Sequence, residues 1–360
     1  MPKCHALINS LQLDTDLRFR PCGTFLRDEY TVDHGAVSWV EYVNSDFYKN
    51  VRNIQENGWH PNCESCRIDE ELGRHSKRTG INEELSGAEG QLEYMDLSIS
   101  NQCNLTCKMC SPAASTKWAT LMPANPKLEK YYQLISTDER TIDSVLSTVD
   151  FSNVKKIVLK GGEPFFGSNF DVVLEKIKST RALEDIEIYI ITNTTFFPKQ
   201  NIEDLKKFKK LEIMMSIDGL DDLCNYIRTG ASWDRVSKVA VQWIDLYNNS
   251  TNMELTVGFT IQALNLHEYR RVKKWADDNN IDFYGNLLKE PKQLSIYSLP
   301  QQYVDDLKSQ GLLEDEILEQ ILTGQQYPEA DMFELIELQD QSMNTSLAET
   351  IPALYAYKHR

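Results

Sequence analysis

The stretch that decides the fold is YMDLSISNQCNLTCKMC, which runs from Tyr94 to Cys110. It begins with an apolar run of strand length and ends with Cys103, Cys107 and Cys110, spaced as C-x3-C-x2-C. Structural metal sites usually have four protein ligands, whereas a site that binds a further molecule keeps one position open. Three cysteines therefore favour a metal site with an open coordination position.

Five further apolar, β-branched runs of strand length follow along the chain. They are KKIVLK (155–160), EIYIIT (187–192), LEIMMSI (211–217), ELTVGFTI (254–261) and IDFYGNLL (281–288). Amphipathic helical patterns such as FDVVLEKIKST and DRVSKVAVQWIDLY separate these runs. Buried strands that alternate with helices indicate βα units around a parallel sheet. The sequence therefore predicts an α/β fold, specifically a partial (β/α)6 TIM-like barrel.

The segments before and after this alternation differ from it in composition. Many turn formers occur in the first part of the chain, together with Cys4, Cys22, Cys63 and Cys66. Acidic, amphipathic stretches such as LPQQYVDDLKSQ follow the last predicted strand and predict a C-terminal helical segment. We therefore expect a cysteine-rich region at 1–92, the barrel at 93–290 and the helical segment at 291–360.

The composition limits the classes of partner that we expect. The chain has 360 residues and a formal net charge of −16, which disfavours bulk nucleic-acid binding. One basic run, GRHSKRTG (73–80), is expected to form a solvated loop. No apolar run approaches the ~20 residues of a membrane span, and the first residues lack a signal-peptide pattern, so we expect a cytoplasmic protein. In that reducing compartment, spaced cysteines indicate metal ligands before disulfides.

The position of the three cysteines in the predicted barrel indicates their chemistry. Functional residues of such folds gather at the carboxyl ends of the strands, and these cysteines directly follow the first strand. Three thiolates can bind three irons of a cubane [4Fe–4S] cluster and leave the fourth iron open. The alternative is a zinc or disulfide knuckle, which predicts an even number of cysteines here.

This motif at the end of a first barrel strand resembles the radical S-adenosylmethionine (SAM) superfamily. The resemblance covers roughly residues 94–288. It implies an enzyme in which a [4Fe–4S] cluster with an open iron binds SAM. It also implies reductive cleavage of SAM to a 5′-deoxyadenosyl radical that abstracts hydrogen from a substrate. The implied partners are SAM, a substrate and an electron donor such as flavodoxin or ferredoxin. No catalytic residue is predicted.

Motifs at the next two strand ends extend the resemblance. The stretch KGGEPFF contains Gly161, Gly162, Glu163 and Pro164. It resembles the loop with which the family binds the amino group of SAM, and its glycines allow a ligand to approach the backbone closely. The third strand ends in ITNTT, where Thr192 and Asn193 resemble polar residues that lie near the SAM ribose.

The ends of the fourth and fifth strands, together with the cysteine motif itself, supply the remaining predicted SAM contacts. By resemblance, Ser216 and Arg228 hold the SAM carboxylate, for which a guanidinium offers a planar, bidentate fork. The alternative for Arg228 is a surface ion pair. Gln262 is the candidate for contacts to adenine and ribose. Met109 occupies a position that is often aromatic in the family, and its thioether can also pack against adenine.

The four N-terminal cysteines resemble the auxiliary-cluster region of SPASM/twitch radical SAM enzymes, here placed before the barrel. In that pattern a cysteine, a strand, a turn and a Pro-Cys pair lead into an auxiliary cluster, and a glycine usually stands where this chain has Leu17. The ligand set Cys4, Cys22, Cys63 and Cys66 suits a second [4Fe–4S] cluster or zinc. His5, His60 and His75 lie near these cysteines in sequence and are expected to be solvated or hydrogen-bonded.

Several functions remain open from the sequence. The leading hypothesis is a radical SAM enzyme that acts on a peptide, a protein or a small metabolite. One alternative is a catalytically inactive iron–sulfur or zinc-binding interaction module, and another is a nucleotide-modifying radical SAM enzyme. Cys224 is the remaining cysteine; it is expected to be a small, half-buried residue, or else a hydrogen-atom donor in the active site.

Overall fold

A computed structural model describes residues 3–25, 38–132 and 141–358. Within these residues the strands form an eight-stranded sheet in the order β2-β1-β3-β4-β5-β6-β7-β8. Their bounds are β1 (Ser10–Leu13), β2 (Phe19–Arg20), β3 (Tyr94–Ser98), β4 (Lys156–Lys160), β5 (Glu187–Thr192), β6 (Lys210–Ser216), β7 (Met253–Ile261) and β8 (Asp282–Leu287). Strands β3 to β8 are the six predicted from the sequence, so the predicted α/β partial barrel is confirmed.

The chain divides into two compact units. Unit 1 comprises Met1–Asn101, Ser136–Ile190 and Gln200–Leu211, and unit 2 comprises Gln102–Ile135, Ile191–Lys199 and Glu212–Arg360. The units are defined by contacts in the structure, whereas the regions predicted above are defined by composition and sequence pattern. The boundaries of those regions, 1–92, 93–290 and 291–360, therefore stay a prediction.

In unit 1 the strands run parallel except at the edge. β1 pairs with β3, β3 with β4 and β4 with β5 in parallel, while β2 pairs with β1 antiparallel. The helices are α1 (Ala6–Asn9), α2 (Trp39–Asn44), α3 (Asp46–Asn57), α4 (Glu64–Glu71), α5 (Lys77–Glu84), α7 (Ile142–Leu146), α8 (Asn169–Thr180) and α9 (Ile202–Leu205), with 3-10 turns η1 (Pro61–Cys63) and η4 (Leu183–Asp185).

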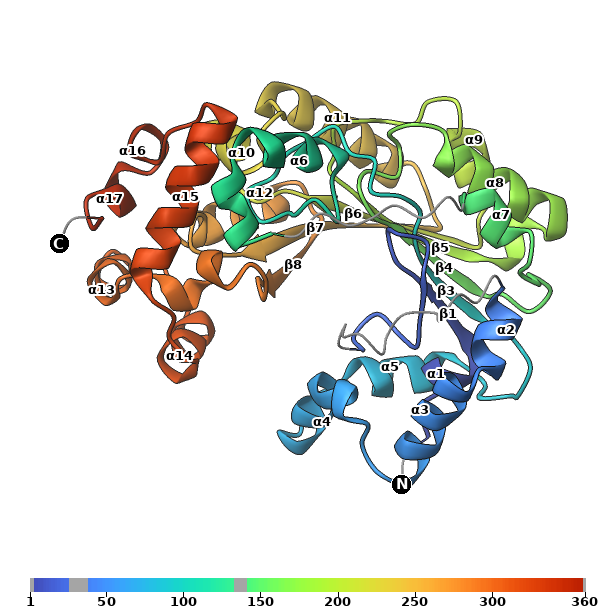
Figure 1. Ribbon diagram of the computed structural model, residues 1–360. Helices are drawn as coiled ribbons and strands as arrows, with labels where there is room; N and C mark the ends of the chain where they lie inside the picture. Colours follow the sequence, from blue (N-terminus) through green and yellow to red (C-terminus); the bar gives the residue numbers. More distant parts are fainter. Residues whose placement is uncertain (1–2, 26–37, 133–140, 359–360) are drawn as a thin grey trace. The chain divides into compact units, whose positions relative to one another are not determined.

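Alternation of side chains gives the sheet of unit 1 an apolar and a polar face. Ile157 and Leu159 of β4 are fully buried, as are Ile188 and Ile190 of β5. Helix α8, which lies beside these strands in Figure 1, buries an apolar stripe that begins at Phe170. Because successive side chains of a strand point to opposite faces, the residues between them form the second face.

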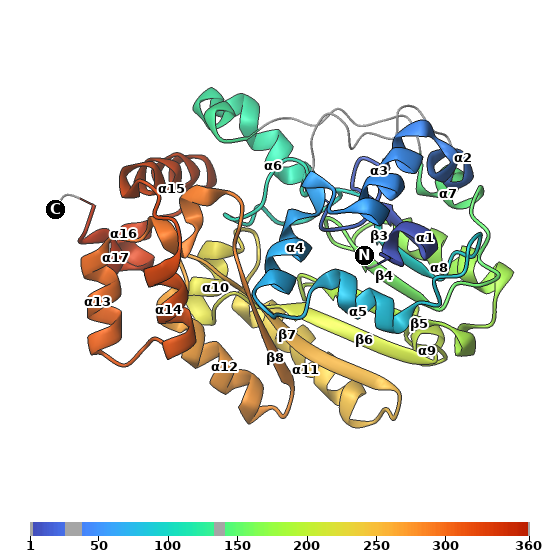
Figure 2. The same cartoon turned by 90° about the horizontal axis from the view of Figure 1, so that it is seen from below.

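Unit 2 repeats the alternation of strands and amphipathic helices. β7 and β8 are parallel neighbours, α11 packs on β7, and α12 packs on both strands (Figure 2). The helices are α6 (Thr116–Leu121), α10 (Asp221–Ile227), α11 (Trp233–Asn248), α12 (Tyr269–Asp278), α13 (Gln301–Ser309), α14 (Asp315–Thr323), α15 (Glu329–Met343), α16 (Leu347–Thr350) and α17 (Pro352–Tyr355). The 3-10 turns are η2 (Met122–Ala124), η3 (Pro126–Lys130), η5 (Leu266–Glu268), η6 (Lys292–Leu294) and η7 (Ile296–Ser298).

The basic run at 73–80 is only in part the solvated loop that the sequence predicts. Ser76 and Thr79 form a capping box that begins α5, so the second half of the run is helical. Arg78 is buried and forms an ion pair with Glu70, while Lys77 lies 3.5 Å from Asp96 Oδ2. The expectation of a solvated loop therefore holds for the exposed residues 73–75 but is wrong for the second half, and three basic side chains of the run, Arg74, Lys77 and Arg78, have carboxylate partners in the fold.

The C-terminal helical segment is present as predicted and is acidic on its outer side. Its longest helix, α15, buries Met332, Leu335 and Ile336. In the part of the chain that the structure describes, no helix combines the length and the apolar character needed to span a membrane.

Candidate functional site

The three-cysteine loop, defined here as residues 102–111, belongs to unit 2. Cys103 and Cys107 are buried and pack around Leu105, which is fully buried. Cys110 and Met109 are partly buried and pack against this group. The loop thus presents its three predicted ligands from a compact apolar base.

Backbone hydrogen bonds fix the three-cysteine loop next to Arg228. The amides of Thr106 and Lys108 donate to the carbonyls of Thr229 and Ile227, each at 2.8 Å. These two bonds flank Cys107 on one segment and Arg228 on the other, so the two residues are held opposite each other. Trp118 Nε1 donates to the Cys107 carbonyl at 2.7 Å and fixes the loop from a second side.

The guanidinium of Arg228 lies between a carboxylate and a cysteine. Arg228 Nη2 is 2.5 Å from Asp218 Oδ2, and Nη1 is 4.0 Å from Cys107 Sγ. Burial opposes the charge of Arg228, but Asp218 and the cysteines outweigh it and raise the arginine pKa. Asp218 is itself fixed, since its Oδ1 accepts from the Thr260 amide at 2.7 Å.

Arg228 is therefore not the surface ion pair considered as the alternative, because both partners are buried. Its side chain is 9% exposed, and that of Asp218 is fully buried. Ser216 is half-buried at the end of β6, two residues before Asp218. Of the two predicted carboxylate-binding residues, Ser216 thus ends β6, whereas Arg228 directly follows α10 and is linked to the β6 end through Asp218.

The cysteine sulfurs have donors that suit thiolates. Cys103 Sγ accepts from the Leu105 amide at 3.4 Å and from Asn193 Nδ2 at 3.8 Å. The thiols of Cys107 and Cys110 share a hydrogen bond, which raises the pKa of Cys107 and lowers that of Cys110. N–H donors to sulfur favour the charged form and tune cluster potentials, so the donor set fits a [4Fe–4S] cluster.

Among residues 3–25, 38–132 and 141–358, no three His, Cys, Asp or Glu side chains converge tightly enough to hold one metal ion. This criterion applies to ligands of a single ion. In a cubane cluster each cysteine binds a different iron, so the sulfurs need not converge on one point.

Thr192 and Asn193 are buried at the end of β5. Thr192 Oγ1 accepts from the Thr194 amide at 3.2 Å. Asn193 Nδ2 donates to Asn104 Oδ1 at 2.9 Å, which ties it to the three-cysteine loop. Asn193 therefore positions that loop, a contact that the sequence did not predict; a role near a ribose stays a prediction.

Gln262 is fully buried, yet neither polar atom of its amide has a hydrogen-bond partner within the described residues. Its backbone is firmly held, since the Gln262 amide donates to Asn265 Oδ1 at 2.9 Å and Asn265 Nδ2 donates to the Asp218 carbonyl at 3.0 Å. Buried polar groups almost always have partners. The unsatisfied amide therefore fits a polar ligand at this strand end.

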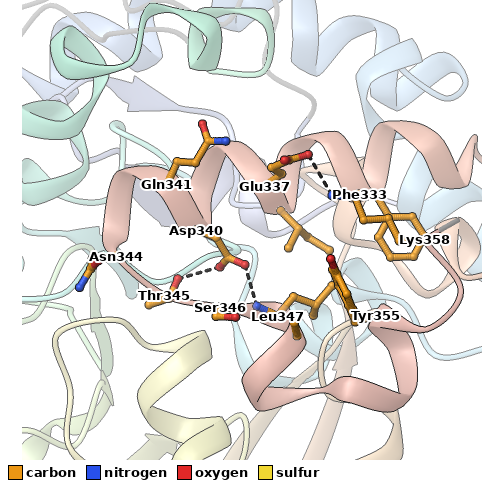
Figure 3. Close-up of a pocket in the computed structure, with 12 residues that line it drawn as sticks. Phe333, Glu337, Asp340, Gln341, Asn344, Thr345, Ser346, Leu347, Tyr355 and Lys358 are labelled. Carbon is orange, nitrogen blue, oxygen red and sulfur yellow. Dashed lines mark hydrogen bonds and ion pairs between the residues drawn. The ribbon is translucent and has the colours of Figure 1, made fainter.

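Helix α15 holds the three-cysteine loop through contacts that the sequence analysis missed. Gln339 Nε2 donates to the Lys108 carbonyl at 2.8 Å. The fully buried ammonium of Lys108 lies 2.7 Å from Asp340 Oδ1 and 4.3 Å from the centre of the Tyr226 ring. Asp340 also accepts from Thr345 and from the Leu347 amide, and it lines a cavity of ≈ 390 Å³ shown in Figure 3.

In unit 1 the GGEP motif forms a tight loop after β4. Gly161 has φ of +127°, and a Cβ there would lie 2.4 Å from the Ser100 carbonyl oxygen. The Gly162 amide donates to the same oxygen at 2.7 Å. Glu163 and Pro164 are buried, and Glu163 Oε1 accepts from the Phe165 amide at 3.1 Å. Only glycine fits at position 161.

The four N-terminal cysteines come together in unit 1, although two long segments separate them in sequence. Cys4, Cys22, Cys63 and Cys66 line one cavity. Burial and the neighbouring cysteines raise the pKa of Cys4 to about 12 and also raise that of Cys63. Thr24 Oγ1 lies 3.5 Å from Cys22 Sγ and 3.9 Å from Cys66 Sγ. The four thiols thus line one cavity without converging tightly enough to hold a single metal ion.

The three histidines that lie near these cysteines in sequence have hydrogen-bond partners elsewhere, as expected. His5 Nδ1 lies 2.8 Å from the Leu85 carbonyl, His60 Nδ1 accepts from the Asn62 amide at 3.1 Å, and His75 lies 3.4 Å from Glu83. Leu17 has φ of +60°, in the left-handed region that favours glycine.

Cys224 is fully buried in α10, and burial raises its pKa to about 12. It is more deeply buried than the half-buried residue that the sequence predicts.

Sequence comparison relates part of this chain to a known superfamily. Residues 97–262 match the sequence model of the radical SAM superfamily. Two curated relatives are named GTP 3′,8-cyclase. The protein from Mannheimia succiniciproducens is 25% identical over 206 residues, which are 57% of this chain and 56% of that protein. The protein from Helicobacter pylori is 26% identical over 275 residues, 74% of this chain and 71% of that protein. The chain thus spans about half the length of the first of these relatives.

Solved structures show weaker similarity. Native anSMEcpe with bound AdoMet and Cp18Cys peptide is 18% identical, with a TM-score of 0.40 over 66% of this chain and 62% of that chain. The superfamily match covers the three-cysteine loop, the GGEP motif and the strand ends up to Gln262. Residues 97–262 of this chain are therefore similar to the radical SAM superfamily.

Proposed function

We propose that the protein is an active radical SAM enzyme in which Cys103, Cys107 and Cys110 bind a [4Fe–4S] cluster. When bound and reduced, such a cluster supplies the electron that cleaves SAM to methionine and a 5′-deoxyadenosyl radical, which takes hydrogen from a substrate. The observation that carries the proposal is the pairing of the three-cysteine loop with the segment of Arg228, which holds a buried guanidinium 4.0 Å from Cys107 Sγ.

The chain's own residues have distinct roles in this proposal. Arg228 and Ser216 bind the SAM carboxylate, because a guanidinium already oriented by Asp218 loses little freedom on binding. The Gly161–Pro164 loop binds the amino group through its backbone and Glu163. Thr192 and Asn193 lie near the SAM ribose. The side-chain amide of Gln262, which has no partner in the described residues, forms hydrogen bonds with the nucleoside of SAM. Met109 packs against adenine.

The N-terminal cysteines form a separate part of the proposal. Cys4, Cys22, Cys63 and Cys66 bind an auxiliary [4Fe–4S] cluster of the SPASM/twitch type, with zinc as the alternative. Support comes from the convergence of all four on one cavity. Iron analysis of the reconstituted protein should give about eight irons per chain, whereas about four irons and one zinc would contradict the auxiliary cluster.

The substrate of the enzyme is a separate question with two candidate answers. We propose that the substrate is a peptide, a protein or a small metabolite. Modification of a nucleotide is the second candidate, and the specific observation in its favour is the name GTP 3′,8-cyclase shared by the curated relatives. Consumption of GTP with formation of 5′-deoxyadenosine would decide for the second candidate.

The experiment that tests the activity is reductive cleavage of SAM by the reconstituted protein. Dithionite-reduced protein should form 5′-deoxyadenosine, detected by liquid chromatography. Replacing Cys103, Cys107 or Cys110 with Ala should abolish product formation and leave the N-terminal metal in place. Cys224→Ala is the matched control, because this buried cysteine lies outside the loop. No product from wild-type protein with a fully loaded first cluster would support the inactive interaction module instead.

A further inference from the structure

The polar face of the sheet in unit 1 carries a charged cluster that the SAM-binding residues do not use. Gln12 of β1 pairs directly with Asp96 of β3, and Asp96 pairs with Val158 of β4. Lys160 lies two residues beyond Val158, so its side chain shares the face of Gln12 and Asp96. Lys77, at the start of α5, reaches the same carboxylate. We call Gln12, Lys77, Asp96 and Lys160 the polar cluster.

The polar cluster has two cations for one carboxylate. Lys160 Nζ lies 2.6 Å from Asp96 Oδ1, and Lys77 Nζ lies 3.5 Å from Oδ2. The side chain of Asp96 is 4% exposed, whereas each lysine side chain is 31% exposed. One close ammonium is sufficient to pair a buried carboxylate. The second leaves a net positive charge, and each ammonium has three N–H donors, so donors remain available for a ligand.

The same cluster holds an acceptor without a donor. Gln12 is 3% exposed, and its Oε1 has no hydrogen-bond partner in the described part of the chain. A Cβ on Gly23 would lie 2.7 Å from Lys77 Nζ and 2.8 Å from Gln12 Oε1. The glycine after Cys22 therefore leaves room where the polar atoms converge. A buried acceptor of this kind favours a ligand that brings its own N–H or O–H.

We propose that the polar cluster binds an anionic oxygen group of the substrate, a carboxylate or a phosphate, with a hydrogen-bond donor beside it. The inference rests on the proposed function and deepens it, because it names the chemistry of the substrate. Lys77 and Lys160 hold the anion, and Gln12 accepts from its donor. Lys160 is the last residue of β4 and directly precedes Gly161, so the cluster extends to the strand end where barrel enzymes gather their functional residues.

Direct binding of two small probes tests the inference and separates the two sources of the anion. We expect the reconstituted protein to bind pyrophosphate or succinate saturably, as measured by isothermal titration calorimetry at low salt. A preference for pyrophosphate would identify a phosphate and a preference for succinate a carboxylate. Absence of saturable binding for both probes would overturn the inference.

Charge variants make the test specific to the polar cluster. Lys77→Gln and Lys160→Gln should each weaken probe binding by about tenfold. Asp96→Asn should strengthen it, because removal of the carboxylate removes repulsion of the anion. Lys155→Gln is the matched control, since Lys155 lies just before β4 and pairs with the buried Glu93 at 3.1 Å. Equal loss of binding in this control, or weaker binding in Asp96→Asn, would contradict the inference.

The outcome is distinguishable from that of the proposed function. Wild-type protein that cleaves SAM but binds neither probe would refute the polar cluster as an anion site and leave the enzyme proposal intact. Protein that binds a probe with the expected dependence on Lys77 and Lys160 but forms no 5′-deoxyadenosine would support the polar cluster as an anion site and refute the enzyme proposal.

Discussion

The ammonium of Lys108 is fully buried and lies 2.7 Å from Asp340 Oδ1, although 232 residues separate the two in sequence. Lys108 stands between Cys107 and Met109, so this pair fastens helix α15 to the three-cysteine loop. Burial lowers the pKa of Lys108, and Asp340 opposes that effect. Helix α15 is therefore part of the support of the proposed cluster rather than an independent appendage.

Asp340→Asn should destabilise the protein by about 3 kcal/mol, because it leaves the Lys108 ammonium buried without a counter-charge. Chemical denaturation and the iron content after reconstitution measure the effect. Glu337→Gln on the same helix is the control, since Glu337 is 54% exposed and its pair with Lys358 should contribute less than about 1 kcal/mol. Adding Lys108→Met to Asp340→Asn should recover most of the loss; a double variant as unstable as the single one would contradict this account.

Leu17→Gly should stabilise the N-terminal region. Leu17 has φ of +60°, a conformation that costs an L-residue about 1–2 kcal/mol and glycine almost nothing. Leu17→Ala is the matched control, because alanine also removes the side chain but keeps the strain. We expect the glycine variant to exceed the alanine variant by about 1 kcal/mol in unfolding free energy. Equal stability of the two would show that the turn carries no such strain.

Gly161→Ala should damage the GGEP loop more than the same change at an unhindered glycine. A methyl group at position 161 would lie 2.4 Å from the Ser100 oxygen, so the backbone must move. At Gly73, which has φ of +69° and no neighbour within 4 Å, the change should cost only about 1 kcal/mol. Equilibrium binding of SAM should be lost in Gly161→Ala and retained in Gly73→Ala. Retention in both variants would remove this loop from the proposed SAM site.

His267 should make stability depend on pH in the acidic range. Burial lowers its pKa to about 4, below the value of about 6.5 for an exposed histidine, so the folded state favours the neutral ring. Its contribution is complete above about pH 6.5 and is lost as pH falls toward 4. As pH falls over this range, the melting temperature of His267→Gln should therefore decrease less than that of the wild type. His75→Gln, a change at a 63% exposed ring, should match the wild-type curve. Parallel curves for all three proteins would refute the assignment.

Local sequence pattern was sufficient to predict much of the fold. The strands of the barrel are short β-branched runs bounded by helices, and each of those runs is a strand in the structure. The strand order was not predictable, because apolar runs carry no information about their neighbours. The N-terminal region is more helical than its turn formers indicate: α3 extends over Asp46–Asn57.

The part of the candidate site that could be predicted lies in contiguous motifs, namely the three cysteines and GGEP. Contacts between distant residues were missed. Lys108 looked like an ordinary charged residue, because its partner Asp340 lies in a helix with no motif of its own. Lys77 was assigned to a solvated loop, because its partner Asp96 is hidden within an apolar strand.

The central claim is that three cysteines leave one iron open for SAM. It is tested most directly by electron paramagnetic resonance of reduced protein in which Cys4, Cys22, Cys63 and Cys66 are replaced by Ala, so that one cluster remains. We predict a [4Fe–4S]⁺ signal that changes shape when SAM is added, and no such signal when Cys107 is also replaced. A cluster signal that SAM leaves unchanged, or a signal that survives the loss of Cys107, would contradict the account.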